Sequence, residues 1–252
     1  MPVTPDGEHE QQDDIDHSHP PLSEGDSPAL EISVGACIRP RVLASAAGHE
    51  LIDVTSQLRP LVESMFATHK QVVARIWRSN NPILWHEYSE TKLSLPLTTD
   101  LLLVGTEDFS LASGLDPNRN EKLLWHGTMT EQFAHSICSR GFNLQLARSG
   151  TFGFGVYFSG DLATPLSRAG ASGNVLARFL ILSRTNRVLL GRPYRASTRL
   201  PGYKQSPPGE HQPSDSVVGL VSYGLEERVE FCVYTAQQIY PEYLIECTPA
   251  SR

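Results

Sequence analysis

A short apolar stretch, residues 123–128, constrains the fold more than any other part of this chain. It reads Leu-Leu-Trp-His-Gly-Thr, and apolar runs of this length that end at a glycine are typical of buried β-strands. His126 and Gly127 therefore place an imidazole and a backbone without a side chain at the end of a strand. Because glycine lets a ligand approach the main-chain N–H and C=O closely, this strand end is a candidate binding edge.

Two later stretches have the same character. Residues 153–158 read Gly-Phe-Gly-Val-Tyr-Phe, and residues 229–234 read Val-Glu-Phe-Cys-Val-Tyr. Taken singly, His126 is expected to be a core histidine and Tyr157 a buried aromatic residue. Glu230 is more informative, because it lies in mid-strand on a face with uncharged neighbours. A carboxylate there either faces solvent or lines a cleft.

Charge and cysteine content exclude several classes of protein. The 252 residues carry a net charge of -7, which does not indicate a nucleic-acid-binding surface, since phosphate contacts need clustered Lys and Arg. No apolar segment is long enough to span a bilayer. Cys37, Cys138, Cys232 and Cys247 form no CxxC pair and no ligand spacing with histidine. We therefore expect reduced thiols, no zinc, and an intracellular protein, nuclear or cytoplasmic.

The amino-terminal residues differ in composition from the rest of the chain. Residues 1–30 are acidic and polar with almost no large apolar side chains, so they cannot bury enough surface to offset their chain entropy. This composition is not that of a secretory signal. We expect a disordered acidic tail over residues 1–30 and a single folded domain over residues 31–252.

Periodicity within this domain indicates an α+β fold. Many Gly and Pro residues suggest short strands and long loops, among them a loop over residues 192–216. Pro60 implies a kink or a late start in the first helix. Helices are predicted at residues 51–66, from Pro82, at 130–140 and at 162–171, and strands at 71–77, 123–128, 156–158, 175–182, 187–190, 229–234 and 239–246.

Taken together, the three stretches resemble the catalytic domain of the poly(ADP-ribose) polymerases, which are diphtheria-toxin-like ADP-ribosyltransferases with a His-Tyr-Glu triad. The matching blocks are residues 123–128, 140–142, 152–158, 229–234 and 240–245, and the resemblance covers about residues 72–246. It implies two packed, mainly antiparallel sheets with flanking helices. It also implies an enzyme that breaks the nicotinamide–ribose bond of NAD and passes ADP-ribose to an acceptor.

The resemblance assigns roles to individual residues. NAD is the co-substrate and no metal is needed. The backbone of Gly127 would bind the nicotinamide carboxamide, with help from the hydroxyl of Ser167, and Tyr157 would stack on the ring. The catalytic set is His126, Tyr157 and Glu230: His126 would bind the adenosine ribose, and Glu230 would bind the 2′-hydroxyl of the nicotinamide ribose. Thr128 completes the NAD-binding set.

Two departures from the family pattern keep other functions open. No second tyrosine stands at residues 168–170 to sandwich the nicotinamide, and Leu166 replaces a common lysine. A catalytically silent NAD-pocket interaction module and a glycohydrolase that uses water are therefore alternatives. Polymer synthesis needs a groove for a second ADP-ribose, and residues 192–216 give no sign of one. We therefore favour mono(ADP-ribosyl)ation of a protein acceptor, this chain included, over poly(ADP-ribose) synthesis.

The composition of the tail leads to one test. Removing residues 1–29 should leave the melting temperature and NAD turnover nearly unchanged, because this segment contributes no core. Thermal denaturation of the full and shortened chains checks this expectation. A fall of many degrees on truncation would show that the tail packs on the domain.

Overall fold

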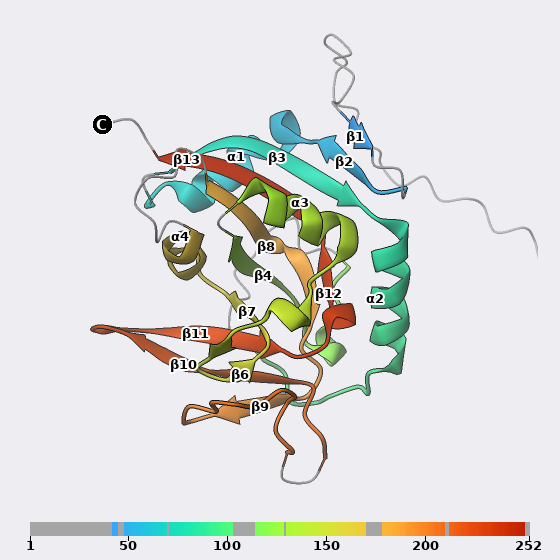
Figure 1. Ribbon diagram of the computed structural model, residues 1–252, viewed down its shortest axis with the longest axis vertical. Helices are drawn as coiled ribbons and strands as arrows, with labels where there is room; N and C mark the ends of the chain where they lie inside the picture. Colours follow the sequence, from blue (N-terminus) through green and yellow to red (C-terminus); the bar gives the residue numbers. More distant parts are fainter. Residues whose placement is uncertain are drawn as a thin grey trace, which may run out of the picture. The chain divides into compact units, whose positions relative to one another are not determined.

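The computed structural model describes residues 42–44, 48–69, 71–102, 114–128, 130–169, 178–209 and 212–249. All of them belong to one compact unit, Arg39–Arg252. The predicted tail, residues 1–30, lies outside the described residues, as does Cys37. The described part contains both helices and a large sheet (Figure 1), which confirms the α+β class.

Ten strands follow one another through backbone pairing in the order β1-β2-β3-β13-β8-β4-β7-β11-β10-β9, and an eleventh strand, β12, pairs with β8 beside this path. In Figure 1, β9 to β11 lie at the opposite end of this path from β1 to β3. The strands are β1 (Val42–Ala44), β2 (Glu50–Asp53), β3 (Gln71–Asn80), β4 (Glu121–Thr128), β7 (Val156–Ser159), β8 (Arg178–Leu189), β9 (Pro193–Ala196), β10 (Ser216–Tyr223), β11 (Glu226–Val233), β12 (Ile239–Pro241) and β13 (Tyr243–Pro249). Strands β5 (Ser149–Gly150) and β6 (Gly153–Phe154) form a separate pair.

Strand β4 joins two parts of this path. It pairs with β8 along most of its length, but the register shifts between Leu124 and His126. At Trp125, between them, β4 pairs instead with Ser159 of β7. Nearly all the pairings are antiparallel, β9 with β10 being parallel. The two sheets that the resemblance implies are therefore the two halves of one path, joined at Trp125.

Four α-helices are present in the described part: α1 (Thr55–Phe66), α2 (Pro82–Ser94), α3 (Glu131–Arg140) and α4 (Ala163–Ala169). Short 3₁₀ helices lie at η2 (Pro117–Arg119), η3 (Leu144–Leu146) and η4 (Ala236–Gln238). Helix α1 packs on β3, and α4 packs on β4 (Figure 1). Thr130 caps α3 by accepting a hydrogen bond from the Phe133 N–H, and Gly141 ends the helix with a φ of 78°. Both ends of α3 were predicted from these residues.

Several predicted boundaries were wrong. Leu51 belongs to β2, so the first helix begins only at Thr55, although it does continue through Pro60. The strands predicted at residues 175–182 and 187–190 are one strand, β8, within the described residues. The polar sequence between them suggested a break. Pairing with β4 and β13 over residues 178–181 and with β4 and β12 over residues 186–189 flanks this segment on both sides, so the strand runs on through it.

Strands β9 and β10 were also missed. The predicted loop over residues 192–216 contains β9, and β10 begins at its last residue. Gly219 interrupts the apolar pattern of β10. It is tolerated because the ring of Phe152 occupies the space where a side chain would stand, 2.7 Å from the position that a Cβ would take. Strand β10 forms because it pairs with β11. The local sequence does not show this pairing, so it could not predict the strand.

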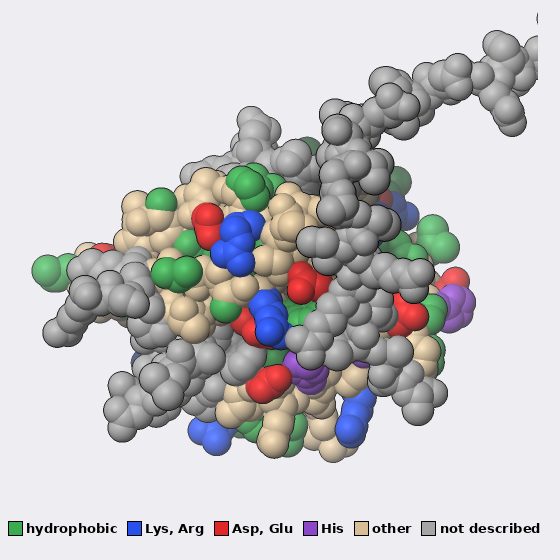
Figure 2. Space-filling view, turned by 90° about the horizontal axis from the view of Figure 1, so that it is seen from above, with side chains coloured by type: hydrophobic (Ala, Val, Ile, Leu, Met, Phe, Trp, Pro, Cys, Tyr) green, Lys and Arg blue, Asp and Glu red, His purple; other side chains and the backbone are tan. Residues whose placement is uncertain are grey.

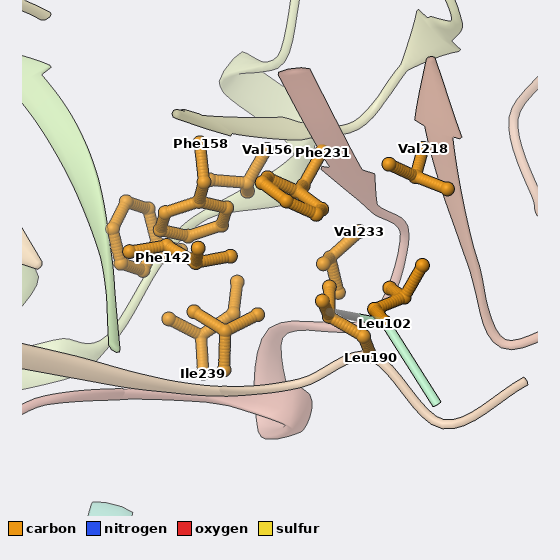
Figure 3. Close-up of a cluster of buried hydrophobic side chains, with 11 residues drawn as sticks. Leu102, Phe142, Val156, Phe158, Leu190, Val218, Phe231, Val233 and Ile239 are labelled. Atoms are coloured by element: carbon orange, nitrogen blue, oxygen red, sulfur yellow. The ribbon is translucent and has the colours of Figure 1, made fainter. Parts of the chain in front are cut away.

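A cluster of buried apolar side chains lies between the strands that carry the three motif stretches. Figure 3 shows side chains from β7, β10 and β11 meeting Phe142, Ile239 and their neighbours. Phe158 and Phe231 are almost fully buried there. Because residues on one strand alternate between the two faces of a sheet, this cluster places Tyr157 and Glu230 on the opposite face from Phe158 and Phe231. The core thus fixes which way Tyr157 and Glu230 face.

The visible side chains on one face carry charges of both signs. In Figure 2, Lys and Arg side chains lie close to Asp and Glu side chains, among hydrophobic and neutral ones. Among the described side chains on that face there is no continuous run of cations. The described side chains of that face therefore form a mixture of charges and not a patch of one sign.

Asn81 provides a test of how the helices are held. Its side chain accepts a hydrogen bond from the Leu84 N–H at 3.1 Å and donates to the carbonyls of Cys138 and Ser139, each at 3.0 Å. It therefore caps α2 and ties it to the end of α3. Replacing Asn81 with Ala should lower the free energy of unfolding by about 2–4 kcal/mol, because a cap and two buried acceptors lose their partner.

The neighbouring Asn80 serves as the control. It is exposed and makes a long hydrogen bond of 3.4 Å with Glu50, so Asn80→Ala should change stability by no more than about 0.5 kcal/mol. Urea denaturation of both variants measures the difference. Equal effects would contradict the role given to Asn81.

Candidate active site

The three motif stretches meet at a small cavity of about 80 Å³. Strand β4, strand β7, helix α4 and strand β11 each contribute to its wall. The lining residues are Trp125, His126, Gly127, Tyr157, Phe158, Ser159, Thr164, Pro165 and Glu230. Four of the six predicted site residues are thus brought together, whereas Thr128 and Ser167 lie outside this lining.

His126 directly follows the point where β4 leaves β8. Its Nδ1 lies 2.9 Å from the carbonyl oxygen of Tyr157. A carbonyl only accepts, so Nδ1 carries a hydrogen, and in a neutral ring Nε2 is then the acceptor nitrogen. Edge contacts with Phe142, at 5.0 Å between ring centroids, and a tilted contact with Phe158, at 5.7 Å, hold the imidazole plane. The backbone of β7 thereby fixes both the tautomer and the orientation of His126.

Tyr157 is anchored by its hydroxyl group. The hydroxyl donates to the carbonyl of Gly153 and accepts from the N–H of Phe152, both at 2.8 Å. Its ring stacks at 13° on the ring of Phe152. Gly150 makes room for it, because a Cβ there would stand 2.5 Å from the Tyr157 ring. Burial raises the pKa of Tyr157 far above its ordinary value, so the hydroxyl stays protonated and keeps its hydrogen bond to Gly153.

Glu230 is buried in the cavity wall, with 1% of its surface exposed. Its backbone pairs with Gly219 on β10 and with Ser159 on β7. One carboxylate oxygen accepts a hydrogen bond from the hydroxyl of Tyr223 at 2.5 Å. Of the two interpretations that the sequence allowed, a carboxylate lining a cleft is therefore confirmed. A buried carboxylate needs such donors, since burial without them is costly.

Gly127 lies against the backbone of α4. A Cβ placed on Gly127 would collide with the carbonyl of Pro165, whose carbon would be 2.9 Å away. The requirement for glycine here comes from this close approach. The bare backbone of β4 and the first turn of α4 thus form one narrow corner of the cavity.

Ser167 lies on the exposed side of α4, where its hydroxyl donates to the carbonyl of Thr164 at 2.7 Å. Its predicted contact with the carboxamide stays a prediction. The wall of the cavity on α4 is formed instead by Thr164 and Pro165. Thr164 is 3% exposed, and its hydroxyl accepts a hydrogen bond from Arg228 at 3.3 Å.

The sequence did not single out Thr164, Pro165, Tyr223 or Arg228. An arginine and a glutamate two residues apart on one strand share a face, so Arg228 was the member of this group that could have been found. Tyr223 could not be found without knowing the pairing of β10 with β11.

A larger cavity of about 720 Å³ lies beside His126 on the side of Phe142. Helix α3, η3 and the segment before η4 line it, with Arg140, Asn143, Gln145 and Gln237 among its polar residues. Because Phe142 lines this cavity and also touches His126, the histidine stands between the small cavity and the larger one.

The described part of the chain shows neither a metal cluster nor a membrane span. Its residues include no group of three or more His, Cys, Asp or Glu side chains placed to hold a metal ion. Among the helices described, none has the length and apolar character needed to cross a membrane.

Comparison with known proteins places this site in a family. A family model described as "Poly(ADP-ribose) polymerase catalytic domain" matches residues 53–249. Protein mono-ADP-ribosyltransferase PARP12 of Mus musculus is 27% identical to the chain over 135 residues, which are 53% of this chain and 18% of that relative. The chain thus matches under a fifth of the relative's length. The family match contains every residue of the cavity wall, and this chain belongs to the poly(ADP-ribose) polymerase catalytic domain family.

Proposed function

We propose that this chain is an NAD-dependent ADP-ribosyltransferase that moves one ADP-ribose unit from NAD to a protein acceptor and releases nicotinamide. The observation that carries the proposal is the meeting of His126, Gly127 and the buried Glu230 carboxylate in one cavity. Family membership supports the use of NAD as the co-substrate. The chain's own residues supply the chemistry described next.

Breaking the bond between nicotinamide and ribose builds positive charge on the ribose, as in glycoside hydrolysis. The carboxylate of Glu230 stands in a water-poor wall, where it interacts with such a charge more strongly than it would in water. The interaction between such a carboxylate and the 2′-hydroxyl of the ribose becomes stronger as the positive charge develops. Glu230 therefore stabilises the transition state more than the bound substrate, which is what raises a rate.

The two cavities suggest how NAD would be divided between them. The small cavity offers the bare backbone of Gly127 and the aromatic side chains of its wall to the half of NAD made of nicotinamide and its ribose. The larger cavity offers Arg140 and amide side chains to the ADP half. His126 stands between them with Nε2 as an acceptor, which suits a ribose hydroxyl. This placement supports the role predicted for His126 toward the adenosine ribose.

Thr164 is better placed than Ser167 to donate a hydroxyl hydrogen bond to the nicotinamide carboxamide. Thr164 lines the cavity next to Gly127, whereas Ser167 is exposed and bonded to its own helix. Ser167 therefore lies two residues beyond Pro165, the nearest residue of α4 that lines the cavity. NAD binding should depend on the threonine.

The product is proposed to be a single ADP-ribose. A third cavity of about 690 Å³ does lie beside β9, within the loop that was expected to build an acceptor groove. Its lining includes Arg192, Tyr194 and Ser214 but no residue of β11. An acceptor held there would not meet Glu230, so this cavity does not support elongation to a polymer. The relative from Mus musculus is likewise named a mono-ADP-ribosyltransferase.

Reaction with NAD labelled in the adenine separates the remaining alternatives. A transferase puts label on protein as single units, a polymerase gives a ladder of long chains, a glycohydrolase gives free ADP-ribose, and a silent interaction module gives no product. The acceptor protein, this chain included, and a nuclear or cytoplasmic location remain predictions. Label on protein, in single units, is the outcome we expect.

Glu230→Gln should lower the rate of transfer by about a hundredfold or more while leaving the Kd for NAD nearly unchanged, because it removes a preorganised charge and keeps the side-chain shape. Glu227→Gln is the matched control, since this residue lies on the same strand but is exposed. Single-turnover kinetics and calorimetry give the two quantities. An undiminished rate in Glu230→Gln would refute the role of this carboxylate.

Thr164→Val should weaken NAD binding several-fold, because the side chain keeps its shape but loses the hydroxyl. Ser167→Ala should leave the Kd almost as it is. Calorimetric titration of both folded variants decides between the two hydroxyls. The reverse order of effects would restore Ser167 as the contact residue and would contradict the assignment of Thr164.

A further inference from the structure

We propose that Tyr223 is a positioning residue for Glu230, and that Arg228 holds Tyr223 in place. The inference rests on the proposed function, because it concerns the geometry of the carboxylate that the reaction uses. It assigns a task to the far end of the β10–β11 hairpin, which contributes no side chain to the cavity wall.

The hairpin brings these residues to one face. Glu230 lies opposite Gly219, Arg228 opposite Val221, and Tyr223 opposite Glu226 at the end of the pairing. Because side chains two apart on a strand face the same way, Tyr223 and Arg228 share the face of Glu230. Gly219 carries no side chain that could support the carboxylate from across the strand pair.

Tyr223 reaches back along the hairpin to supply that support. Its hydroxyl donates to one oxygen of Glu230 at 2.5 Å. A hydroxyl that donates to a carboxylate makes a stronger hydrogen bond than one that donates to a neutral acceptor. The bond therefore selects one orientation of a carboxylate that is 1% exposed.

Arg228 braces the tyrosine ring. Its guanidinium carbon lies 5.6 Å from the centre of the Tyr223 ring, within the range of a cation–π contact. The same guanidinium pairs with Glu226 and donates to the hydroxyl of Thr164 at 3.3 Å. Tyr223 is thereby held between its own hydrogen bond and a cation that is anchored to both the hairpin and α4.

A tyrosine hydroxyl suits this task better than a cation would. The reaction builds positive charge on the ribose beside Glu230, and a lysine or arginine bonded to the carboxylate would oppose that charge. A neutral donor orients the carboxylate without cancelling its charge. Orientation matters because a displacement of about 1 Å can cost a hundredfold in rate.

The test uses Tyr223→Phe, which keeps the ring next to Arg228 and removes only the hydroxyl. The single-turnover rate should fall by about tenfold or more, since a hydrogen bond to a charged group is lost. The Kd for NAD should stay within about twofold of the wild-type value, as expected when an interaction acts only in the transition state. Tyr203→Phe is the control, because Tyr203 is an exposed tyrosine away from Glu230.

Introducing Tyr223→Phe into the Glu230→Ala variant shows whether Tyr223 acts by positioning Glu230 or only by supporting the structure. In Glu230→Ala no carboxylate is left to orient, so adding Tyr223→Phe should change the residual rate by less than about twofold. Equal losses in both backgrounds, or an unchanged rate in Tyr223→Phe alone, would overturn the inference and leave the proposed function standing. A wild-type chain that neither transfers nor hydrolyses would overturn both.

Discussion

The site depends on one irregularity in the pairing of β4. Between Leu124 and His126 the register of β4 against β8 shifts, and at Trp125 the strand pairs with β7 instead. Irregularities of this kind re-aim side chains and are common beside active sites. Here the change of partner lets β4 belong to both halves of the sheet path. It brings His126 within hydrogen-bond distance of the β7 backbone and exposes Gly127 to α4.

Around this junction, the proposed catalytic groups are held by strands and not by loops. Phe158 and Phe231 lock β7 and β11 into the core from one face, so that Tyr157 and Glu230 must face the other. A carboxylate buried in this way would be costly without donors. The Tyr223 hydroxyl meets part of that cost and at the same time fixes the carboxylate's direction. The hydrogen bond between Tyr223 and Glu230 therefore both offsets part of the cost of burying the carboxylate and holds it in one orientation.

The sequence predicted the motif-bearing strands and the ends of α3 because local signals determine them. Thr130 and Gly141 are cap residues with a clear physical role, and the apolar runs around His126 and Glu230 are typical of strands. The local sequence did not predict the strands whose formation depends on pairing with distant parts of the chain. Strand β8 runs on through its polar middle because other strands pair with it on both sides of that segment, and β10 tolerates Gly219 because Phe152 fills the space. The contact of Ser167, which the resemblance implied, stays a prediction, while the turn of α4 that lines the cavity carries Thr164.

The most direct test of the account is a crystal structure with a non-hydrolysable NAD analogue. The account predicts the nicotinamide beside the backbone of Gly127, between β4 and α4. The 2′-hydroxyl of its ribose should lie within hydrogen-bond distance of Glu230, and the ADP half in the cavity next to Phe142. An analogue bound in the cavity beside β9, or bound with its nicotinamide ribose away from Glu230, would contradict it.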